Sequence, residues 1–523
     1  MRVAAALSKG WRGTGPAQKG KSYMNTFIDV MEKLNNIKST ENGAVAYEST
    51  NSKVYDLFAF GGAYRNRSDF DVIKLFYDAY DEDSTLALKC LFYLRDVRGG
   101  QGERRFFRIA FNWLCNYDRI AAERNLLNVA EYGRWDDLIY TTYNTPVWDR
   151  TVAIVSEQLI LDIESTTPSL LGKWMPSENA SSYNTHMMAG QLRKALDLTP
   201  KQYRKMLSAL RKRINIVETL MSENRWDEIE FDKIPSKAGL VYKNAFARRD
   251  IIAKKYEAFV KSDKTTVNAS ALYPYEVVRK ATEHYGSWGR NKRLNSTDRA
   301  AINKYWENLP DYFDGAECNL MCVVDTSASM TWSGAGQVMP IDVAISLGLY
   351  TAERLRGPFH NNYISFSRNP RLIKTEGYDF VDKVERIYDT NLCENTDLPK
   401  VFDLLYTIAK ANHCEDELPE TIVIISDMEI DEGCSHGWGR DRNFDAISTM
   451  EQIREKWNRG GLKMPKLVYW NVNARNNTIL DLSKDVSCVS GCSPTIFKQV
   501  ITGKTGTDLM LEVLMAKRYA AVR

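Results

Sequence analysis

The spacing of apolar residues divides the chain into a helical part and a part in which strands alternate with helices. Up to about residue 310, apolar positions recur every three or four residues, which is the period of helices that bury one face. The clearest start signal is a capping box in which Thr199 precedes Pro200 and Gln202. Further helices are predicted over 23–34, 69–80, 85–94, 103–114, 120–130, 135–140, 151–163 and 243–260.

The helix that begins after Thr199 has one apolar face and one cationic face. Its apolar residues continue at helical spacing from Tyr203 to Met221, and lysines and arginines occupy the opposite side. Short loops between successive helices are typical of helical-repeat arrays, and no strict sequence period is visible. The pattern therefore predicts an array of degenerate helical repeats.

The pattern changes after a linker around 308–317. Short apolar runs that end in polar residues now alternate with amphipathic segments, which predicts a mostly parallel sheet covered by helices on both faces. The strands are expected over 319–324, 363–367, 372–374, 421–426 and 467–470. The helices are expected over 341–355, 398–411, 443–457 and 506–516.

Oxygen-bearing side chains follow the ends of two predicted strands. Asp325, Ser327 and Ser329 follow the first strand, Thr396 precedes a helix, and Asp427 follows the strand over 421–426. Ligands of such sheets bind beyond the carboxyl ends of the strands, and two carboxylates with three hydroxyls suit Mg2+ or another divalent cation. With so few charged ligands, the metal would accept an external carboxylate. The alternative is that these residues only cap a helix and order a loop.

Charge is distributed unevenly along the chain, although the total is only +3. Residues 201–300 hold 22 Lys and Arg against 12 Asp and Glu, which favours an anionic partner such as RNA. Aromatic residues, among them Trp226 and Tyr242, are interleaved with these cations. The alternative is that each charge run is a solvated helix face. The candidate RNA-binding residues are Lys173, Arg204, Lys205, Arg211, Lys212, Arg213, Lys237, Arg248, Arg249, Arg279, Lys280, Trp288, Arg290, Lys292 and Arg293.

Residues 318–517 resemble a von Willebrand factor A domain with a metal-ion-dependent adhesion site. The resemblance rests on Asp325, Ser327 and Ser329, then Thr396, then Asp427. It implies an α/β, Rossmann-like, doubly wound parallel sheet. The sequence departs from the common family pattern at two positions, since Asn395 and Met428 stand where the family commonly has Gly.

The first part of the chain resembles the TROVE module of the Ro autoantigen family. The resemblance rests on the segments at 91–107, 132–138, 173–178, 203–221 and 271–278. It implies an all-α, HEAT-like ring over residues 21–312, after an N-terminal tail over 1–20 and before the von Willebrand A domain. It also implies binding of small structured or misfolded non-coding RNA, including single-stranded RNA ends.

No catalytic constellation is found in the sequence, so we do not expect an enzyme. The motif H-E-x-x-H is absent from it. Two alternatives to RNA binding stay open: a metal-dependent scaffold that holds a partner's Asp or Glu, and a metal-dependent nuclease that uses Asp325 and Asp427. The chain has no apolar run of about 18 residues and no signal-peptide core, so we expect no membrane association and a cytoplasmic protein.

Overall fold

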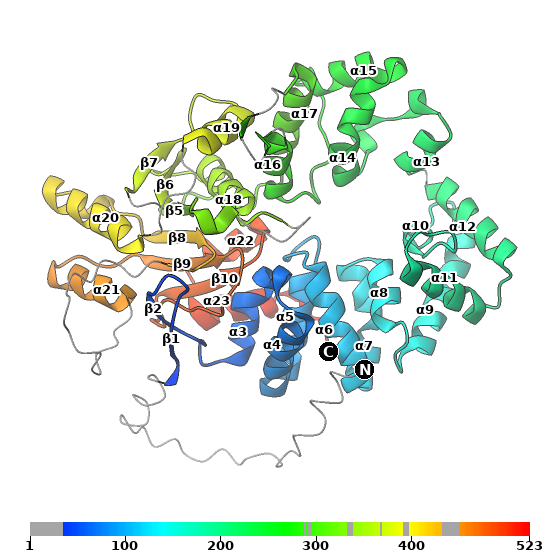
Figure 1. The fold of residues 1–523 in the computed structure, drawn as a ribbon, viewed down its shortest axis with the longest axis horizontal. Coiled ribbons are helices and arrows are strands. Elements are labelled where there is room, and N and C mark those ends of the chain that lie inside the picture. The colour runs from blue at the N-terminus through cyan, green and yellow to red at the C-terminus, as the bar shows by residue number, and fades with distance from the viewer. Residues whose placement is uncertain are drawn as a thin grey trace, which may run out of the picture.

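The molecule is an arc of helices whose two ends both lie on one sheet domain (Figure 1). The computed structural model describes residues 35–214, 216–283, 285–286, 289–290, 294–331, 338–366, 369–390, 397–430 and 449–523. Of the residues at 285–286, 289–290 and 390, only the backbone is described. None of the helices in these ranges combines the length and apolar character that crossing a bilayer requires.

The first part of the arc begins with a short antiparallel hairpin and continues through ten helices of the described chain. The hairpin strands are β1 (Ile37–Ser39) and β2 (Val45–Tyr47), and the short 3-10 helix η1 (Gly61–Asn66) follows the first of these helices. The helices are α3 (Lys53–Phe60), α4 (Asp69–Glu82), α5 (Ser84–Arg95), α6 (Arg104–Tyr117), α7 (Arg119–Tyr132), α8 (Trp135–Thr142), α9 (Trp148–Glu164), α10 (Leu171–Trp174), α11 (Tyr183–Ala195) and α12 (Pro200–Ile214).

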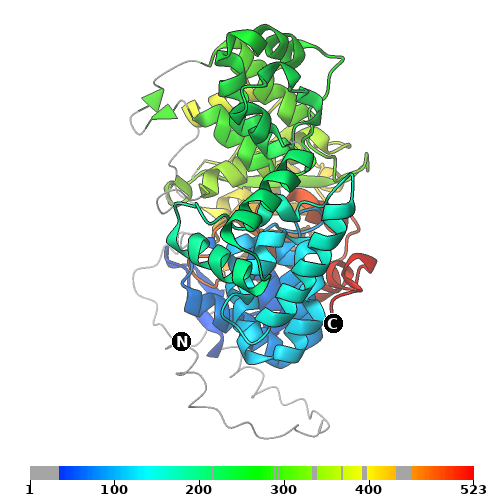
Figure 2. The same cartoon turned by 90° about the vertical axis from the view of Figure 1, so that its right-hand side faces the viewer.

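The second part of the arc leads back to the sheet domain. Its elements are α13 (Val217–Ser222), the 3-10 turn η2 (Trp226–Glu228), α14 (Ser236–Arg248), α15 (Asp250–Lys261), α16 (Pro274–Thr282), the hairpin strands β3 (Tyr285–Gly286) and β4 (Gly289–Arg290), and α17 (Ser296–Glu307). Seen from the side of the arc, these helices lie above the first helices of the chain (Figure 2).

Most predicted helices are confirmed, and two are shorter than predicted. The capping box of α12 is present, since Gln202 N donates to Thr199 Oγ1 at 3.3 Å and Thr199 N donates to Gln202 Oε1 at 2.8 Å. The apolar period runs on to Met221, but α12 ends at Ile214 and α13 is a separate helix. The predicted helix over 243–260 is divided at Arg249, whose extended backbone ends α14 and starts α15. The predicted helix over 23–34 lies outside the described residues.

The sheet domain has the predicted α/β architecture. Its sheet has the order β10-β9-β8-β5-β6-β7, and every neighbouring pair is parallel except the antiparallel edge pair β6-β7. The strands are β5 (Leu320–Asp325), β6 (Asn362–Phe366), β7 (Arg371–Lys374), β8 (Thr421–Ser426), β9 (Lys466–Asn471) and β10 (Val486–Ser490). The helices are α18 (Pro340–Arg354), α19 (Phe380–Thr390), α20 (Leu398–Asn412), α21 (Thr449–Arg459), α22 (Phe497–Val500) and α23 (Gly506–Leu514).

Burial along the central strands explains why they read as continuous apolar runs. Every residue of the central strand β5 is buried, and so are five of the six residues of its neighbour β8, as expected for parallel strands covered on both faces. The sequence pattern identified all strands of this sheet except β10, whose sequence VSCVS mixes small polar and apolar residues.

The N-terminal end of the arc is attached to the end of β10. Gly62 N donates to Ser490 Oγ at 2.9 Å, and Cys488 N donates to the Tyr55 hydroxyl at 2.9 Å. A Cβ atom at Gly62 would lie only 2.6 Å from the Ser490 carbonyl oxygen, so this approach requires glycine. The helix α3 therefore lies directly on the last strand of the sheet.

The glycine-rich loop between α5 and α6 adds to this junction. Gln101 Oε1 accepts a hydrogen bond from Ser493 N at 3.2 Å, and Thr495 Oγ1 donates to the Gly100 carbonyl at 3.3 Å. Near the C-terminus, Arg518 Nη2 bonds Asp96 Oδ1 at 2.7 Å. This loop, which carries the first of the TROVE-like segments, thus joins the helical arc to the sheet domain.

The other end of the arc is attached to α18 and α19. Trp306 of α17 stacks on Phe380 with ring centroids 4.0 Å apart, and its indole Nε1 donates to Glu353 at 2.6 Å. Arg299 of the same helix forms an ion pair with Asp379 at 2.6 Å. Because both ends of the arc contact the sheet domain, the chain closes into a ring (Figure 1).

In the described part of the chain, buried apolar residues form three separate clusters. The largest joins the first helices to the sheet domain, a second spans Ile139 to Leu210, and a third spans Val217 to Ala301. The second cluster is separated from the third between α12 and α13. The far side of the ring is therefore built from two small cores joined by a short connection.

A buried ion-pair network stabilises the first helices. Arg95 Nε bonds Asp137 Oδ2 at 2.9 Å, and Arg108 Nε bonds Asp137 Oδ1 at 2.6 Å. Burial alone would raise the pKa of Asp137, but the two guanidinium groups hold that pKa below its usual range. Asp137 is fully buried and Arg95 is nearly so, and therefore water cannot solvate either charge if its partner is removed.

We expect Asp137→Ala to destabilise the protein by about 3–5 kcal/mol, because the substitution leaves the Arg95 charge buried without its partner. Thermal unfolding followed by circular dichroism measures this effect as a lowered midpoint. The matched control is Asp78→Ala, which removes a carboxylate from an exposed pair with Lys74 and should change stability by less than about 1 kcal/mol. Equal midpoints for the two variants would contradict the structural role of Asp137.

Candidate functional site

Two carboxylates meet where β5 and β8 end. These strands are hydrogen-bonded neighbours, so Asp325 at the end of β5 and Asp427 just after β8 lie at the same edge of the sheet. Both residues are fully buried. Ser426 Oγ donates to Asp325 Oδ2 at 2.5 Å and so helps to fix the first carboxylate.

The two predicted serines lie in the loop that follows Asp325. Ser327 N donates to Asp325 Oδ1 at 2.8 Å, and the Ser327 and Ser329 hydroxyl oxygens are 2.9 Å apart. A hydrogen bond with Ser329 also lowers the pKa of Asp427. The structure thus brings together four of the five predicted metal ligands, and Thr396 lies outside the described residues.

The backbone after Asp427 explains why the related pattern commonly has Gly at the next position. Met428 adopts a φ of 65°, in the left-handed region that favours glycine. Its amide donates to Ser426 Oγ at 3.0 Å, and its side chain is buried. Local hydrogen bonding and packing hold the turn even though a β-carbon is present.

Arg475 is a residue of this site that the sequence reasoning missed. It follows β9 on a loop, and its Nη2 lies 3.2 Å from Asp427 Oδ2 while its Nη1 lies 2.9 Å from Glu41. The sequence did contain a signal for this residue. The next parallel strand ends at the same edge of the sheet and is followed by a short polar segment, Asn471 to Arg475.

Burial and the neighbouring carboxylate disfavour the charged form of Asp427. Burial raises its pKa, the Asp325 carboxylate raises it further, and Arg475 opposes both effects. Although Oδ2 lies near Arg475, it accepts no hydrogen bond of normal geometry from any described residue. A cation at this oxygen would relieve both its desolvation and its repulsion from Asp325.

The N-terminal hairpin lies beside this site. Thr40 Oγ1 donates to the Ile430 carbonyl at 2.6 Å, and Glu41 N donates to Glu429 Oε2 at 2.7 Å. Asn42 Nδ2 donates to the Glu429 carbonyl at 2.7 Å. The segment that follows Asp427 is therefore held by residues nearly 400 positions earlier in the chain.

The donor set fits a hard divalent cation such as Mg2+. Asp325, Ser327, Ser329 and Asp427 would hold it with oxygen ligands only, and it would supply an electrophilic centre able to bind an external carboxylate. Within the described ranges, no group of three or more His, Cys, Asp or Glu side chains is arranged to hold a metal. A cation bound here would be held by serine hydroxyls as well as by two carboxylates.

The predicted RNA-binding residues fall into two groups according to what they contact. Arg211 bonds the carbonyls of Gly172 and Met175 and the Ser177 hydroxyl, each at 3.0 Å, so its guanidinium ties α12 to the turn around α10. Arg213 bonds two carbonyls at the end of α9. These two side chains support the fold of the arc.

Other predicted cations are more accessible. Arg204 is 54% exposed and lies 3.7 Å from Glu178. The side chains of Lys205, Lys212, Lys237, Arg248, Arg249 and Arg279 are also exposed, as is that of Arg213 despite its bonds to the two carbonyls. Lys237 pairs with Glu276, and the partly buried Lys280 pairs with Glu283.

Lys173 is partly buried and contacts the ring of Trp174. Trp288, Lys292 and Arg293 lie outside the described residues, as does the side chain of Arg290.

Two pockets flank α13 and carry most of the accessible cations. One, of about 340 Å3, is lined by Arg204, Arg211 and Lys212 among others. The other, of about 700 Å3, is lined by Arg248 and Arg249 together with aromatic residues. Because Ser222 lines both, the two pockets form one continuous surface around α13.

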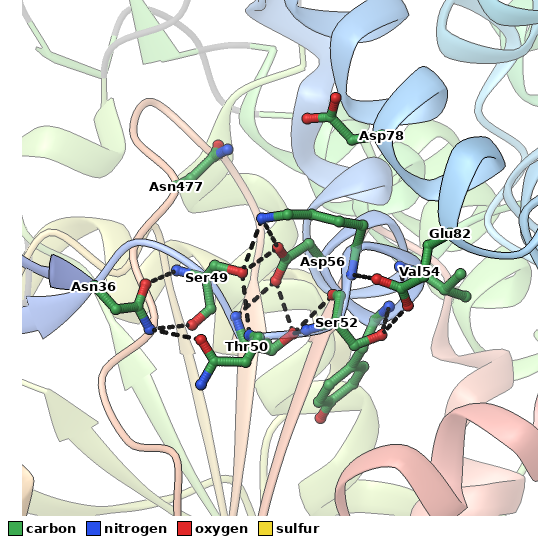
Figure 3. A network of polar contacts seen from close by, with 12 residues as sticks. Asn36, Ser49, Thr50, Ser52, Val54, Asp56, Asp78, Glu82 and Asn477 are labelled. Carbon is green, nitrogen blue, oxygen red and sulfur yellow. Dashed lines mark hydrogen bonds and ion pairs between the residues drawn. The ribbon is translucent and has the colours of Figure 1, made fainter. Parts of the chain in front are cut away.

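A third, larger cavity lies between the hairpin, α3 and α4. Beside it, Asp56 accepts hydrogen bonds from Ser49 Oγ at 2.5 Å and Thr50 N at 2.7 Å, and Ser52 Oγ donates to Glu82 at 2.7 Å (Figure 3). These contacts lock the turn that precedes α3.

The cations around this cavity are paired with carboxylates. The cavity has a volume of about 820 Å3, and its cations lie next to carboxylates, as in the pairs Lys74–Asp78 at 2.6 Å and Arg67–Asp71 at 3.4 Å. Because carboxylates neutralise these cations, the cavity favours neither an anionic nor a cationic ligand.

Comparison with known proteins finds similarity over both parts of the chain. Residues 40–139 and 176–313 match a domain of unknown function, DUF2828, and residues 319–517 match another, DUF7788. Uncharacterized protein L728 of Acanthamoeba polyphaga mimivirus is 29% identical over 532 residues, which cover 92% of this chain and 87% of the relative. The crystal structure of the Deinococcus radiodurans Ro (RSR) protein matches 89% of this chain and 99% of its own, with a TM-score of 0.45 and 14% identity.

We expect Arg475→Gln to tighten divalent-cation binding at the strand-end site about tenfold, because it removes a positive charge that lies against Asp427. Isothermal titration calorimetry with Mn2+ measures the affinity. Asp427→Asn should abolish binding, since the site then retains only one carboxylate.

Arg459→Gln is the matched control for this experiment, because Arg459 is 80% exposed and pairs with Glu455 on α21. It should leave the Mn2+ affinity unchanged. Weaker Mn2+ binding by Arg475→Gln would contradict the competition between the guanidinium and the metal.

Proposed function

We propose that this protein is a cytoplasmic RNA-binding protein that holds small structured RNA, or RNA with a single-stranded end, on the surface around α13. The observation that carries the proposal is the gathering of Arg204, Lys212, Arg248 and Arg249 around two adjoining pockets. RNA binding needs cations for the phosphates and flat side chains for unstacked bases, and this surface offers both.

The basic composition of residues 201–300 supports the same proposal. A solvated helix face accounts for exposed lysines spread along a helix, but it does not account for arginines that converge with aromatic residues on pockets. The resemblance of five sequence segments to the TROVE module favours RNA over other polyanions.

We further propose that the strand-end site binds Mg2+ or another divalent cation and, through it, an Asp or Glu of a protein partner. The support is the convergence of two buried carboxylates and two serine hydroxyls, with one carboxylate oxygen that lacks a hydrogen bond in the described chain. The RNA surface and the metal site lie on different parts of the ring, so both partners can bind together.

The nuclease alternative is less well supported by the same donors. Nucleases that use metal ions surround them with additional carboxylates, whereas here hydroxyls take those positions. Cleavage of RNA that requires a divalent cation and disappears in Asp325→Ala would overturn the non-catalytic assignment.

We expect binding to an RNA hairpin with a single-stranded tail to weaken by orders of magnitude between about 50 and 200 mM salt. Arg204→Glu and Lys212→Glu should each weaken binding and lower the slope of log affinity against log salt by about 1 or more, because each removes a phosphate contact. Fluorescence anisotropy across a salt series measures both quantities.

Arg459→Glu, a charge reversal on the sheet domain, is the control and should leave the slope unchanged. Arg211 is a poor test residue, because its substitution would also disturb α10 and α12. Absence of salt-dependent binding would reject RNA as the ligand and leave the metal-dependent scaffold as the function.

A further inference from the structure

The larger pocket beside α13 has the chemistry to hold one flat, polar ring. Its volume is about 700 Å3, and it lies between α13, η2 and α14. The lining residues that matter here are Glu218, Met221, Trp226, Tyr242, Arg248 and Arg249. Apolar and aromatic surface, one carboxylate and two guanidinium groups therefore surround the same space.

Two buried polar atoms of the lining residues lack hydrogen-bond partners among the described residues. Trp226 is 5% exposed, and its indole Nε1 is buried and donates to no described acceptor. Glu218 accepts the Tyr242 hydroxyl at one carboxylate oxygen, at 3.5 Å, and its other oxygen is buried and unbonded. Buried polar groups in proteins are nearly always paired, so an unused donor and an unused acceptor on two lining residues of one pocket point to a ligand that these side chains reach by turning toward it.

The arginines beside these atoms are available to a phosphate. The Arg249 guanidinium lies 4.8 Å from the centre of the Trp226 ring, and Arg248 is exposed at the end of α14. Neither side chain forms an ion pair with any residue in the described ranges. A ligand with a flat ring and an anionic group would therefore find a partner for each part.

We propose that this pocket holds one unpaired nucleobase of a bound RNA strand, an inference that rests on the proposed RNA binding. Tyr242 and Met221 flank the base, Trp226 and Glu218 bond its edge, and Arg248 and Arg249 hold the neighbouring phosphates. Every base carries an N–H donor beside an acceptor on its Watson–Crick edge, so the pocket tolerates all four. A base-paired nucleotide has this edge occupied and is rejected.

The chemistry of the pocket favours a base over other anionic ligands. An acidic peptide would bring a second carboxylate toward Glu218, and a phosphate alone would leave the aromatic surface and the indole donor unused. A free nucleotide presents the same groups as a nucleotide within a strand, so the experiment must distinguish these two sources.

The test is a double-mutant cycle between the protein and the RNA. The probe is an RNA hairpin with a six-nucleotide single-stranded tail, compared with tails that carry one abasic nucleotide at each position in turn. With the unaltered protein, we expect one abasic position to weaken binding about tenfold, the size of a lost base–aromatic stack. Tyr242→Ala should weaken binding of the intact tail by a similar factor and cause little further loss with that abasic tail.

Two further variants define the contacts. Trp226→Phe keeps an aromatic ring but removes the indole N–H, so it should weaken binding of the intact tail a few-fold and leave binding of the abasic tail unchanged. Tyr183→Ala is the matched control, because Tyr183 is 74% exposed on α11, outside both pockets, and should retain the full tenfold effect of the abasic nucleotide.

If Tyr242→Ala and the abasic nucleotide each weaken binding and their losses of binding free energy simply add, the proposed base pocket is wrong, although the protein still binds RNA. Failure of the hairpin to bind at about 50 mM salt would instead reject the proposed function. If 5′-AMP alone binds more tightly than the tail and its binding is lost in Tyr242→Ala, the ligand is a free nucleotide and the assignment to an RNA strand is wrong.

Discussion

The close approach of η1 to the end of β10 is the constraint on which the rest of the molecule depends. Gly62 brings the backbone of the helical arc against Ser490 at a distance that no β-carbon allows. This contact places α3 on the sheet, and it places the hairpin that precedes α3 beside the residues that follow Asp427. Closure of the ring and completion of the strand-end site are therefore consequences of the same packing.

The ring presents two sites with opposite electrostatic character. At the sheet domain, buried carboxylates and hydroxyls face one another, and Arg475 partly neutralises them. At the far side, around α13, arginines and lysines surround aromatic pockets where the apolar core is divided in two. The proposed cation and the proposed RNA would therefore occupy different parts of the ring and would not compete with each other.

Much of this arrangement could be predicted from the sequence where local physics decides it. The capping box before α12, the apolar runs of β5 and β8, and the carboxylates at their ends all depend on neighbouring residues. Other features depend on distant contacts. The apolar period continues past Ile214, so it does not reveal the break before α13. A helical wheel places Arg211 on a cationic face, but only the fold shows that nearby carbonyls occupy its guanidinium. The polar segment after β9 places Arg475 at the right edge of the sheet, but only the tertiary fold shows that it contacts Asp427 and Glu41.

The pairing of Gly62 with Ser490 also bears on how the chain is made. These residues are 428 positions apart, and a ribosome adds roughly 5–20 residues per second. The first helices therefore wait roughly 20 to 90 s for the strand that covers them, with the apolar faces of α3 and α5 exposed meanwhile. Slower translation lengthens this interval, during which chaperones can cover the exposed apolar faces, and premature termination would release a helical arc that has no partner to close it.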